Sequence, residues 1–226
     1  MLSLSVSRSW RTAYPGAVVG IMALKNAANP KKSDMLESKK RGLENLLRSQ
    51  FSTKSELVAL PIIQAYTDYY KAFRKSYHVL FQIESIALKG KPIPSVVPLV
   101  EAMFIAELKN RLLTAGHDLN ALGLPVTLDI SKGHEHYTML NGKEQSLKPR
   151  DMIMTDNQGP ISSVIYGPDR RTRIIQETKN PLFVVYAPPG VGEGQVIRHL
   201  QDIKGYIELF SPEVYVDSFE TFVAQE

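Results

Sequence analysis

The sequence predicts an α+β protein. Apolar side chains recur every three or four residues through most of the first half of the 226-residue chain, a spacing typical of amphipathic helices. Short runs of period-two alternation follow between residues 126 and 187, divided by pairs such as Asn141-Gly142 and Gly167-Pro168. Helices that precede a strand-rich segment, instead of alternating with strands, are typical of the α+β class.

The starts of two predicted helices follow from proline and glycine residues that interrupt the helical pattern. An amphipathic basic helix begins at Ser33, after the break at Asn29-Pro30. A final helix begins behind Pro188-Pro189-Gly190. Between these two, helices are predicted over residues 55–73, 77–88 and 94–110, the first of them interrupted at Pro61. The final helix is predicted over residues 193–210.

The strands are predicted from alternation and from apolar runs bounded by turn residues. The Asn141-Gly142 pair between two short strands is a strong hairpin signal, because both residues accept the backbone angles of a tight turn. The predicted strands span residues 2–6, 17–24, 126–130, 137–140, 152–155, 161–166, 182–187 and 214–216.

The composition excludes several classes of protein. The chain has no cysteine, which excludes disulfides, thiolate metal sites and cysteine nucleophiles, and a reducing cytoplasm is the expected location. No basic start followed by an apolar run marks a signal peptide, and no apolar run reaches the ~18 residues of a membrane span. We therefore expect a cytoplasmic protein that does not enter a membrane, and a monomer is favoured.

Positive charge is concentrated toward the amino terminus and in one later loop. Lys39, Lys40 and Arg41 lie together in the predicted basic helix. Arg170, Arg171 and Arg173 follow the Gly167-Pro168 turn, and arginine forks match phosphate geometry. These six residues are the candidates for electrostatic, sequence-independent contact with RNA, and the alternative is that they are solvated surface charges.

Four further patterns could carry chemistry. His134 and His136 flank Glu135 at a spacing that can chelate a metal, but no third ligand is identifiable, and the Gly190-x-Gly192-x-Gly194 turn matches no nucleotide-binding fingerprint. We expect neither a metal nor a cofactor. The aromatic stripe from Tyr66 to Tyr77 could stack on bases, although helical spacing favours a place in the core. His117-Asp118, in a predicted loop after Gly116, is the most promising polar pair.

Several landmarks then occur in a familiar order. They are Pro94-Ser95-Val96-Val97, Gly116-His117-Asp118-Leu119, Leu140-Asn141-Gly142 with Leu147 and Pro149, Thr155-Asp156, Gly167, and Glu177-Thr178-Lys179-Asn180. In this order the chain resembles the B3/B4 domain of the bacterial phenylalanyl-tRNA synthetase β subunit, and more closely the stand-alone proteins built on that domain. The resemblance is strongest over residues 94–190, and we expect residues 1–226 to form a single B3/B4-like domain with a strand-rich core and surrounding helices.

The resemblance implies an amino-acid or aminoacyl-tRNA pocket, because the synthetase domain hydrolyses tyrosine mistakenly attached to phenylalanine tRNA. It places Glu101, His117, Asp118 and Asn180 as pocket candidates. The synthetase's discriminating glutamate falls on Val184, which cannot accept a hydrogen bond from a tyrosine hydroxyl. The resemblance therefore implies the fold and a pocket, but not the synthetase's specificity.

Two kinds of function follow. The first is an RNA-associated protein that binds tRNA or aminoacyl-tRNA and could hydrolyse mischarged aminoacyl-tRNA in trans, with catalytic residues that the sequence does not identify. The second is a non-catalytic module for a small amino-acid-like ligand or a protein partner. RNA affinity should fall steeply with salt, whereas affinity for a small ligand should not.

Overall fold

Two long apolar strands form the centre of the main sheet, β2 (Val18–Lys25) and β10 (Pro181–Ala187). The computed structural model describes residues 3–225. β2 and β10 pair antiparallel, with β11 (Tyr215–Val223) outside β2 and β3 (Thr114–Asp118) outside β10. Both faces of the two central strands are covered, which explains why their sequences are almost continuously apolar.

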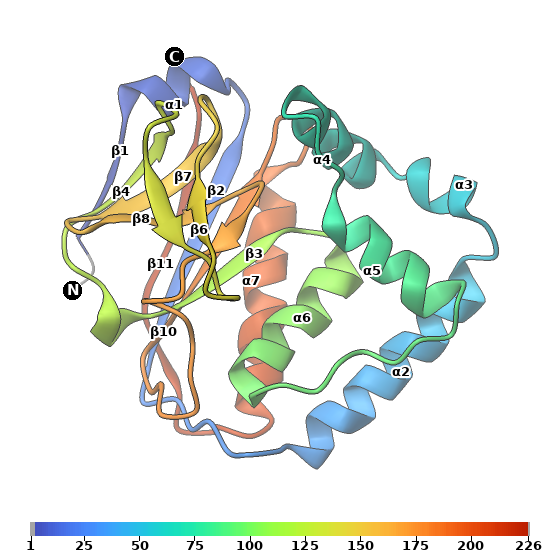
Figure 1. The fold of residues 1–226 in the computed structure, drawn as a ribbon. Helices are drawn as coiled ribbons and strands as arrows, with labels where there is room; N and C mark the ends of the chain where they lie inside the picture. Colours follow the sequence, from blue (N-terminus) through green and yellow to red (C-terminus); the bar gives the residue numbers. More distant parts are fainter. Residues whose placement is uncertain (1–2, 226) are drawn as a thin grey trace.

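A second sheet packs near the first (Figure 1). Its order is β1-β4-β7-β8-β9, with β1 parallel to β4 and the other pairs antiparallel. The Tyr186 and Ser162 hydroxyls share a hydrogen bond that joins β10 of the first sheet to β8 of the second. The strands of the second sheet are β1 (Leu4–Val6), β4 (Val126–Ile130), β7 (Met152–Asp156), β8 (Gly159–Ser163) and β9 (Gly167–Pro168).

A small two-stranded hairpin packs beside β8 of the second sheet. Strands β5 (His136–Thr138) and β6 (Glu144–Ser146) pair antiparallel around the predicted Asn141-Gly142 turn. Gly142 has a φ of +83° and donates its N–H to the Met139 carbonyl at 2.8 Å. The hairpin prediction is confirmed, because glycine adopts this left-handed backbone without a steric penalty.

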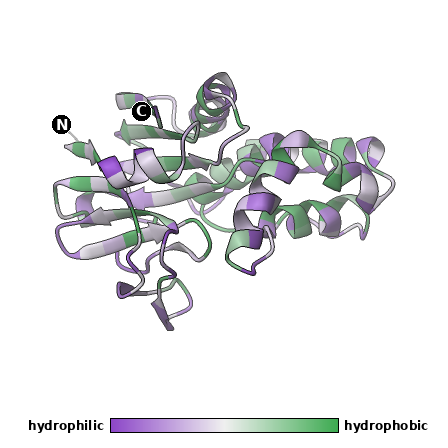
Figure 2. Ribbon diagram, turned by 90° about the horizontal axis from the view of Figure 1, so that it is seen from above, coloured by the Kyte–Doolittle hydropathy of each residue, from purple (hydrophilic) through white to green (hydrophobic). Residues whose placement is uncertain are grey.

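Helices cover one face of the main sheet and form a separate group beside it (Figures 1 and 2). α7 (Glu193–Glu208) lies close against β2, where a Cβ built on Gly20 would come within 2.4 Å of the Val196 side chain. α6 (Pro98–Asn110) packs beside α7 and over β3. The remaining helices are α1 (Arg8–Ala13), α2 (Asp34–Gln50), α3 (Lys54–Val58), α4 (Pro61–Ala72), α5 (His78–Ala87) and the short 3₁₀ helix η1 (Leu119–Ala121).

The aromatic stripe of α4 lies in the core, as the helical spacing predicts. Tyr66 stacks on Tyr77 with ring centroids 4.3 Å apart, and its hydroxyl donates to the Tyr186 carbonyl at 2.7 Å. The Tyr70 hydroxyl donates to the Val164 carbonyl at 2.6 Å. These rings are buried and tie the helical group to the sheets, so they are not available to stack on bases.

The structure confirms the α+β class and corrects several boundaries. The helix predicted from residue 94 begins at Pro98, because residues before proline disfavour the helical backbone and two prolines fall in this segment. The strand predicted over 161–166 spans Gly159–Ser163, and the closing strand extends to Val223. The predicted start of the first strand at Leu2 lies outside the described residues.

His117 and Asp118 were expected in a loop and instead end strand β3. The segment Thr114–Asp118 pairs with β10 along its whole length and is buried.

Within residues 3–225, each helix is too short or too polar to cross a lipid bilayer.

Candidate functional site

A cavity of about 640 Å³ lies beside strand β3, where the main sheet ends. Residues of α5 and α6 line it, together with residues of the segment from Ser163 to Ile174. Most of the lining is apolar, including Val97, Val100, Met103, Phe104, Ala115 and Ile174. This volume and this lining are typical of sites for small ligands.

Gly116 shapes the floor of the cavity. A Cβ at this position would come within 2.8 Å of the Ile174 side chain and 3.2 Å of the Met103 sulfur. The missing side chain therefore lets the walls from α6 and from the 163–174 segment approach β3 closely. Gly116 belongs to one of the sequence landmarks named above, and in the structure it lies in the lining of the cavity.

Glu107 places a carboxyl group in this apolar lining. It projects from α6, is 2% exposed and accepts the Thr114 N–H at 2.9 Å through Oε2. Burial raises its pKa to about 8, because the charged form loses its hydration and the single backbone hydrogen bond only partly offsets that loss. Near neutral pH this carboxyl is mainly uncharged and can donate or accept a hydrogen bond.

A second, more polar cavity of about 540 Å³ lies next to the first. Its lining includes His136, Thr138, Gln158, Arg170, Arg171 and Arg173. Arg173 lines both cavities. The first cavity suits an apolar group of a ligand and the second suits an anionic group, and Arg173 lies between the two cavities.

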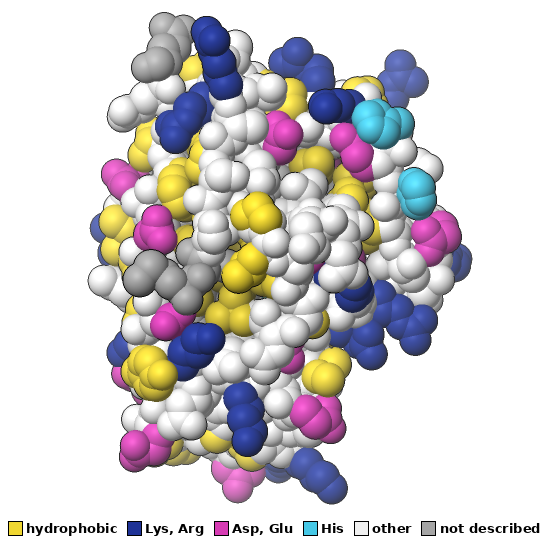
Figure 3. Space-filling view, turned by 90° about the vertical axis from the view of Figure 1, so that its left-hand side faces the viewer, with side chains coloured by type: hydrophobic (Ala, Val, Ile, Leu, Met, Phe, Trp, Pro, Cys, Tyr) yellow, Lys and Arg dark blue, Asp and Glu magenta, His cyan; other side chains and the backbone are white. Residues whose placement is uncertain are grey.

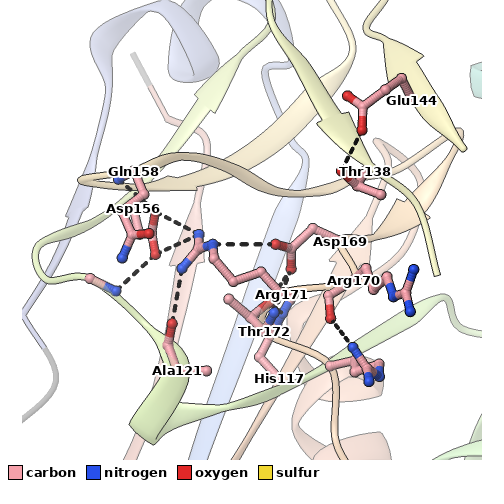
Figure 4. Close-up of polar contacts among 12 residues, drawn as sticks. His117, Ala121, Thr138, Glu144, Asp156, Gln158, Asp169, Arg170, Arg171 and Thr172 are labelled. Atoms are coloured by element: carbon pink, nitrogen blue, oxygen red, sulfur yellow. Dashed lines mark hydrogen bonds and ion pairs between the residues drawn. The ribbon is translucent and has the colours of Figure 1, made fainter. Parts of the chain in front are cut away.

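The three loop arginines differ in what they contact (Figure 4). Arg171 donates to both carboxylate oxygens of Asp156 at 2.9 Å and to the Ala121 carbonyl at 2.9 Å, so it holds the loop in place. Arg173 donates to the Arg170 carbonyl at 2.6 Å. Within residues 3–225 neither Arg170 nor Arg173 forms an ion pair, and both are exposed. These two, rather than Arg171, have guanidinium groups free for an anion.

The basic helix is corrected at one position. Lys40 is 2% exposed and pairs with Glu37 at 2.6 Å and with Glu101 at 3.1 Å. Its ammonium group cannot reach an RNA phosphate without breaking these pairs, so the structure argues against the predicted role of Lys40. Lys39 and Arg41 are exposed on α2, as the prediction requires.

The four pocket candidates lie elsewhere than the main cavity. Glu101 accepts the Val96 N–H at 2.9 Å besides its ion pair, and Asp118 accepts the Thr178 hydroxyl at 2.7 Å. Asn180 donates to the Asn120 side chain at 3.1 Å. These contacts give the three residues structural roles, and none of the three lines either cavity described above.

His117 is the fourth candidate and is fully buried. Its Nδ1 lies 2.7 Å from the Thr172 hydroxyl, which in turn donates to Asp169, so Nδ1 carries the proton in this chain (Figure 4). Burial lowers the pKa of His117 to about 3. Nε2 has no hydrogen-bond partner among the described residues, and His117 does not line the main cavity. The structure thus replaces the predicted cleft of Glu101, His117 and Asp118 with a cavity lined by Glu107.

Glu107 is not among the site residues predicted from the sequence, although a signal for it exists. α6 is buried on nearly all sides, and it carries two glutamates among apolar residues. A carboxyl group in a helix that is apolar all round must be buried with a partner or face a cavity. Glu101 has a partner in Lys40, and Glu107 faces the cavity.

Comparison with known proteins gives a likeness of fold. No family model matches the chain, and no curated protein matches it. The structure is similar to that of an N-terminal fragment of the phenylalanyl-tRNA synthetase β-subunit from Pyrococcus horikoshii, with a TM-score of 0.51 and 11% sequence identity. The likeness covers 97% of this chain and 54% of that chain, so this chain spans about half the length of the fragment. At this identity the comparison shows a shared fold, in agreement with the fold that the sequence resemblance implies.

Proposed function

We propose that the protein binds RNA carrying an apolar aminoacyl group, such as an aminoacyl-tRNA. The observation that carries the proposal is the junction of an apolar cavity and an arginine-lined cavity at Arg173. The acyl side chain would occupy the apolar cavity and the terminal phosphates of the RNA would lie by Arg170 and Arg173. The likeness in fold to a phenylalanyl-tRNA synthetase fragment supports this choice of ligand.

Hydrolysis of the aminoacyl ester is a further step of the same proposal. Ser163 lines the apolar cavity, and its hydroxyl donates to the carboxylate of Asp151, which is the base within hydrogen-bond reach of it. Glu101, His117 and Asp118 lie outside the cavity lining, so an attacking water would be oriented by the substrate's own hydroxyls or by the Glu107 carboxyl group. Incubating the purified protein with a panel of mischarged tRNAs, and measuring the loss of the aminoacyl group, tests this step.

A second candidate function is binding of a small amino-acid-like ligand without RNA. One observation favours it: Lys and Arg side chains are interspersed with Asp and Glu on the face in Figure 3, without an uninterrupted basic stripe. The net charge of +4 also gives only weak long-range attraction to a polyanion at physiological salt. The salt dependence of binding separates the two functions.

Replacing the two free arginines is expected to weaken tRNA binding at low salt. If each contacts one phosphate, the double variant Arg170→Ala/Arg173→Ala should lower the slope of log affinity against log salt by roughly 2. Titration of tRNA at four or five salt concentrations measures this slope. Arg171 is left unchanged, because it holds Asp156 and its loss would disturb the loop.

The matched control is Arg8→Ala/Arg198→Ala, which removes the same charge from exposed positions on α1 and α7. It should leave the slope nearly unchanged. If the parent protein does not bind tRNA even at low salt, the RNA proposal fails and the small-ligand function takes its place.

A further inference from the structure

Glu107 supplies the single carboxyl group in the lining of the apolar cavity, as far as residues 3–225 show. We infer that Glu107 makes the cavity selective for apolar ligands that carry a primary amine, by pairing its carboxylate with the ligand's ammonium group. The inference rests on the proposed use of this cavity as the ligand site, and it adds the chemical class of the ligand.

The geometry of the carboxyl group supports this role. Oε2 accepts the Thr114 N–H at 2.9 Å, which fixes the side chain against β3. Within the described part of the chain, no side chain donates to Oε1 and no cation pairs with Glu107. A buried carboxylate without a counter-charge is strongly unfavourable, so a ligand that brings an ammonium group supplies what the cavity lacks.

The apolar walls determine the rest of the ligand. Val100, Phe104 and Ile174 line the same cavity as the carboxyl group and present hydrocarbon surface. A small cation such as ammonium would leave this surface exposed to water, whereas an amine attached to a phenyl-sized group would cover it. Arg173, at the boundary with the polar cavity, disfavours a second cationic group at that end of the ligand.

The imidazole and phenol groups around Glu107 do not change charge near neutral pH. Burial lowers the pKa of His78 on α5 and lowers that of His199 on α7 to about 3, so both imidazoles stay neutral. Burial raises the pKa of Tyr66, Tyr70 and Tyr77. The charged groups near α6 include Arg173, Arg111, the Lys109–Asp202 pair, and Lys40, which pairs with both Glu37 and Glu101. Asp151, which accepts the Ser163 hydroxyl, has a pKa that burial raises to about 6, and its titration is common to the parent and to Glu107→Gln.

The pH dependence of ligand binding therefore depends on the titration of Glu107. Because burial raises the Glu107 pKa to about 8, the free protein holds a proton there below that pH. An ammonium ligand must displace the proton, so its affinity should rise about tenfold per pH unit up to pH 8 and level off above it. A neutral ligand of the same shape displaces no proton, and its affinity should not rise with pH.

The test compares 2-phenylethylamine with 2-phenylethanol, which has the same shape and no charge. Calorimetric titration of the full chain at pH 6, 7, 8 and 8.5 is expected to show a rise of about tenfold between pH 6 and pH 7 for the amine alone. Glu107→Gln should remove this rise and the preference for the amine while retaining the alcohol. Glu107→Asp, which keeps the charge, should keep the preference with a reduced affinity.

Phe104→Ala is the matched control, because Phe104 lines the same cavity and carries no charge. It should weaken both probes by a similar factor. Equal binding of both probes by the parent, or an amine preference that survives in Glu107→Gln, would overturn the inference. Binding of neither probe would overturn both the inference and the use of the cavity as a ligand site. Amine selectivity together with absent tRNA binding would remove only the RNA part of the proposed function.

Discussion

Glu107→Gln is expected to make the protein more stable than the parent at pH 8, with a difference that shrinks as the pH falls. In the native state burial raises the Glu107 pKa from 4.5 to about 8. The native protein therefore binds more protons than the unfolded chain between these values, and the parent loses unfolding free energy as the pH rises through this window. A separation of about 3.5 pH units corresponds to a loss on the order of 5 kcal/mol, and glutamine, which does not ionise, avoids it.

Chemical unfolding of both proteins at pH 5, 6, 7 and 8 measures this difference. His117 and His199 also titrate with folding, but their lowered pKa values remove stability as the pH falls below about 6.5. That effect is common to parent and variant and cancels in the comparison. Glu213→Gln, at an exposed position, is the control and should run parallel to the parent at every pH. A Glu107→Gln profile that also runs parallel would show that Glu107 does not hold its proton in the native protein.

The result bears on how much of the site the sequence could predict. Periodicity identified α6 as a helix, because Val97, Val100, Phe104 and Leu108 recur at helical spacing. In the structure this helix is buried, with apolar residues, on nearly every side. The same property hides which face a glutamate occupies, since a helix that is apolar all round has no polar face for reference. The position of Glu107 depends on β3 and on the 163–174 segment, which are brought together only by the tertiary fold.

Strand β3 shows a second limit. The segment Thr114–Asp118 has a glycine and three polar residues and no run of β-branched side chains, so its local preference for a strand is weak. Its extended state comes from the ladder with β10. β10, in contrast, was predicted from its continuous apolar run, which is typical of a strand that is buried on both faces. Fold class and central strands are therefore visible in the sequence, whereas an edge strand that lines the cavity is not.

The burial of Lys40 could have been predicted from the sequence, but its positive charge suggested an exposed position. Leu36, Lys40, Leu43 and Leu47 recur with helical spacing, which places the lysine on the buried face of α2. Its inclusion with Lys39 and Arg41 followed the run of positive charge instead of this spacing. Lys40 can be buried because its ammonium group forms ion pairs with Glu37 and Glu101 and donates a hydrogen bond to the Ser95 hydroxyl.

Lys40→Met is accordingly expected to lower the free energy of unfolding by about 3–5 kcal/mol at pH 7. The reason is that Glu101, 3% exposed, would keep its charge without its cation, and an uncompensated buried charge is more unfavourable than the loss of a surface pair. Adding Glu101→Gln should recover a large part of the loss, because the amide oxygen can still accept the Val96 N–H and carries no charge.

Lys39→Met provides the matched control, since it removes the same charge from the neighbouring exposed position. It should change the unfolding free energy by no more than about 0.5 kcal/mol. If Lys39 rather than Lys40 faces the RNA, it is Lys39→Met that should lower the salt slope of tRNA binding, while Lys40→Met leaves that slope unchanged in protein that remains folded. Equal effects of the two substitutions on stability would contradict the buried pair, because the two lysines differ in this structure by burial and partners and not by charge.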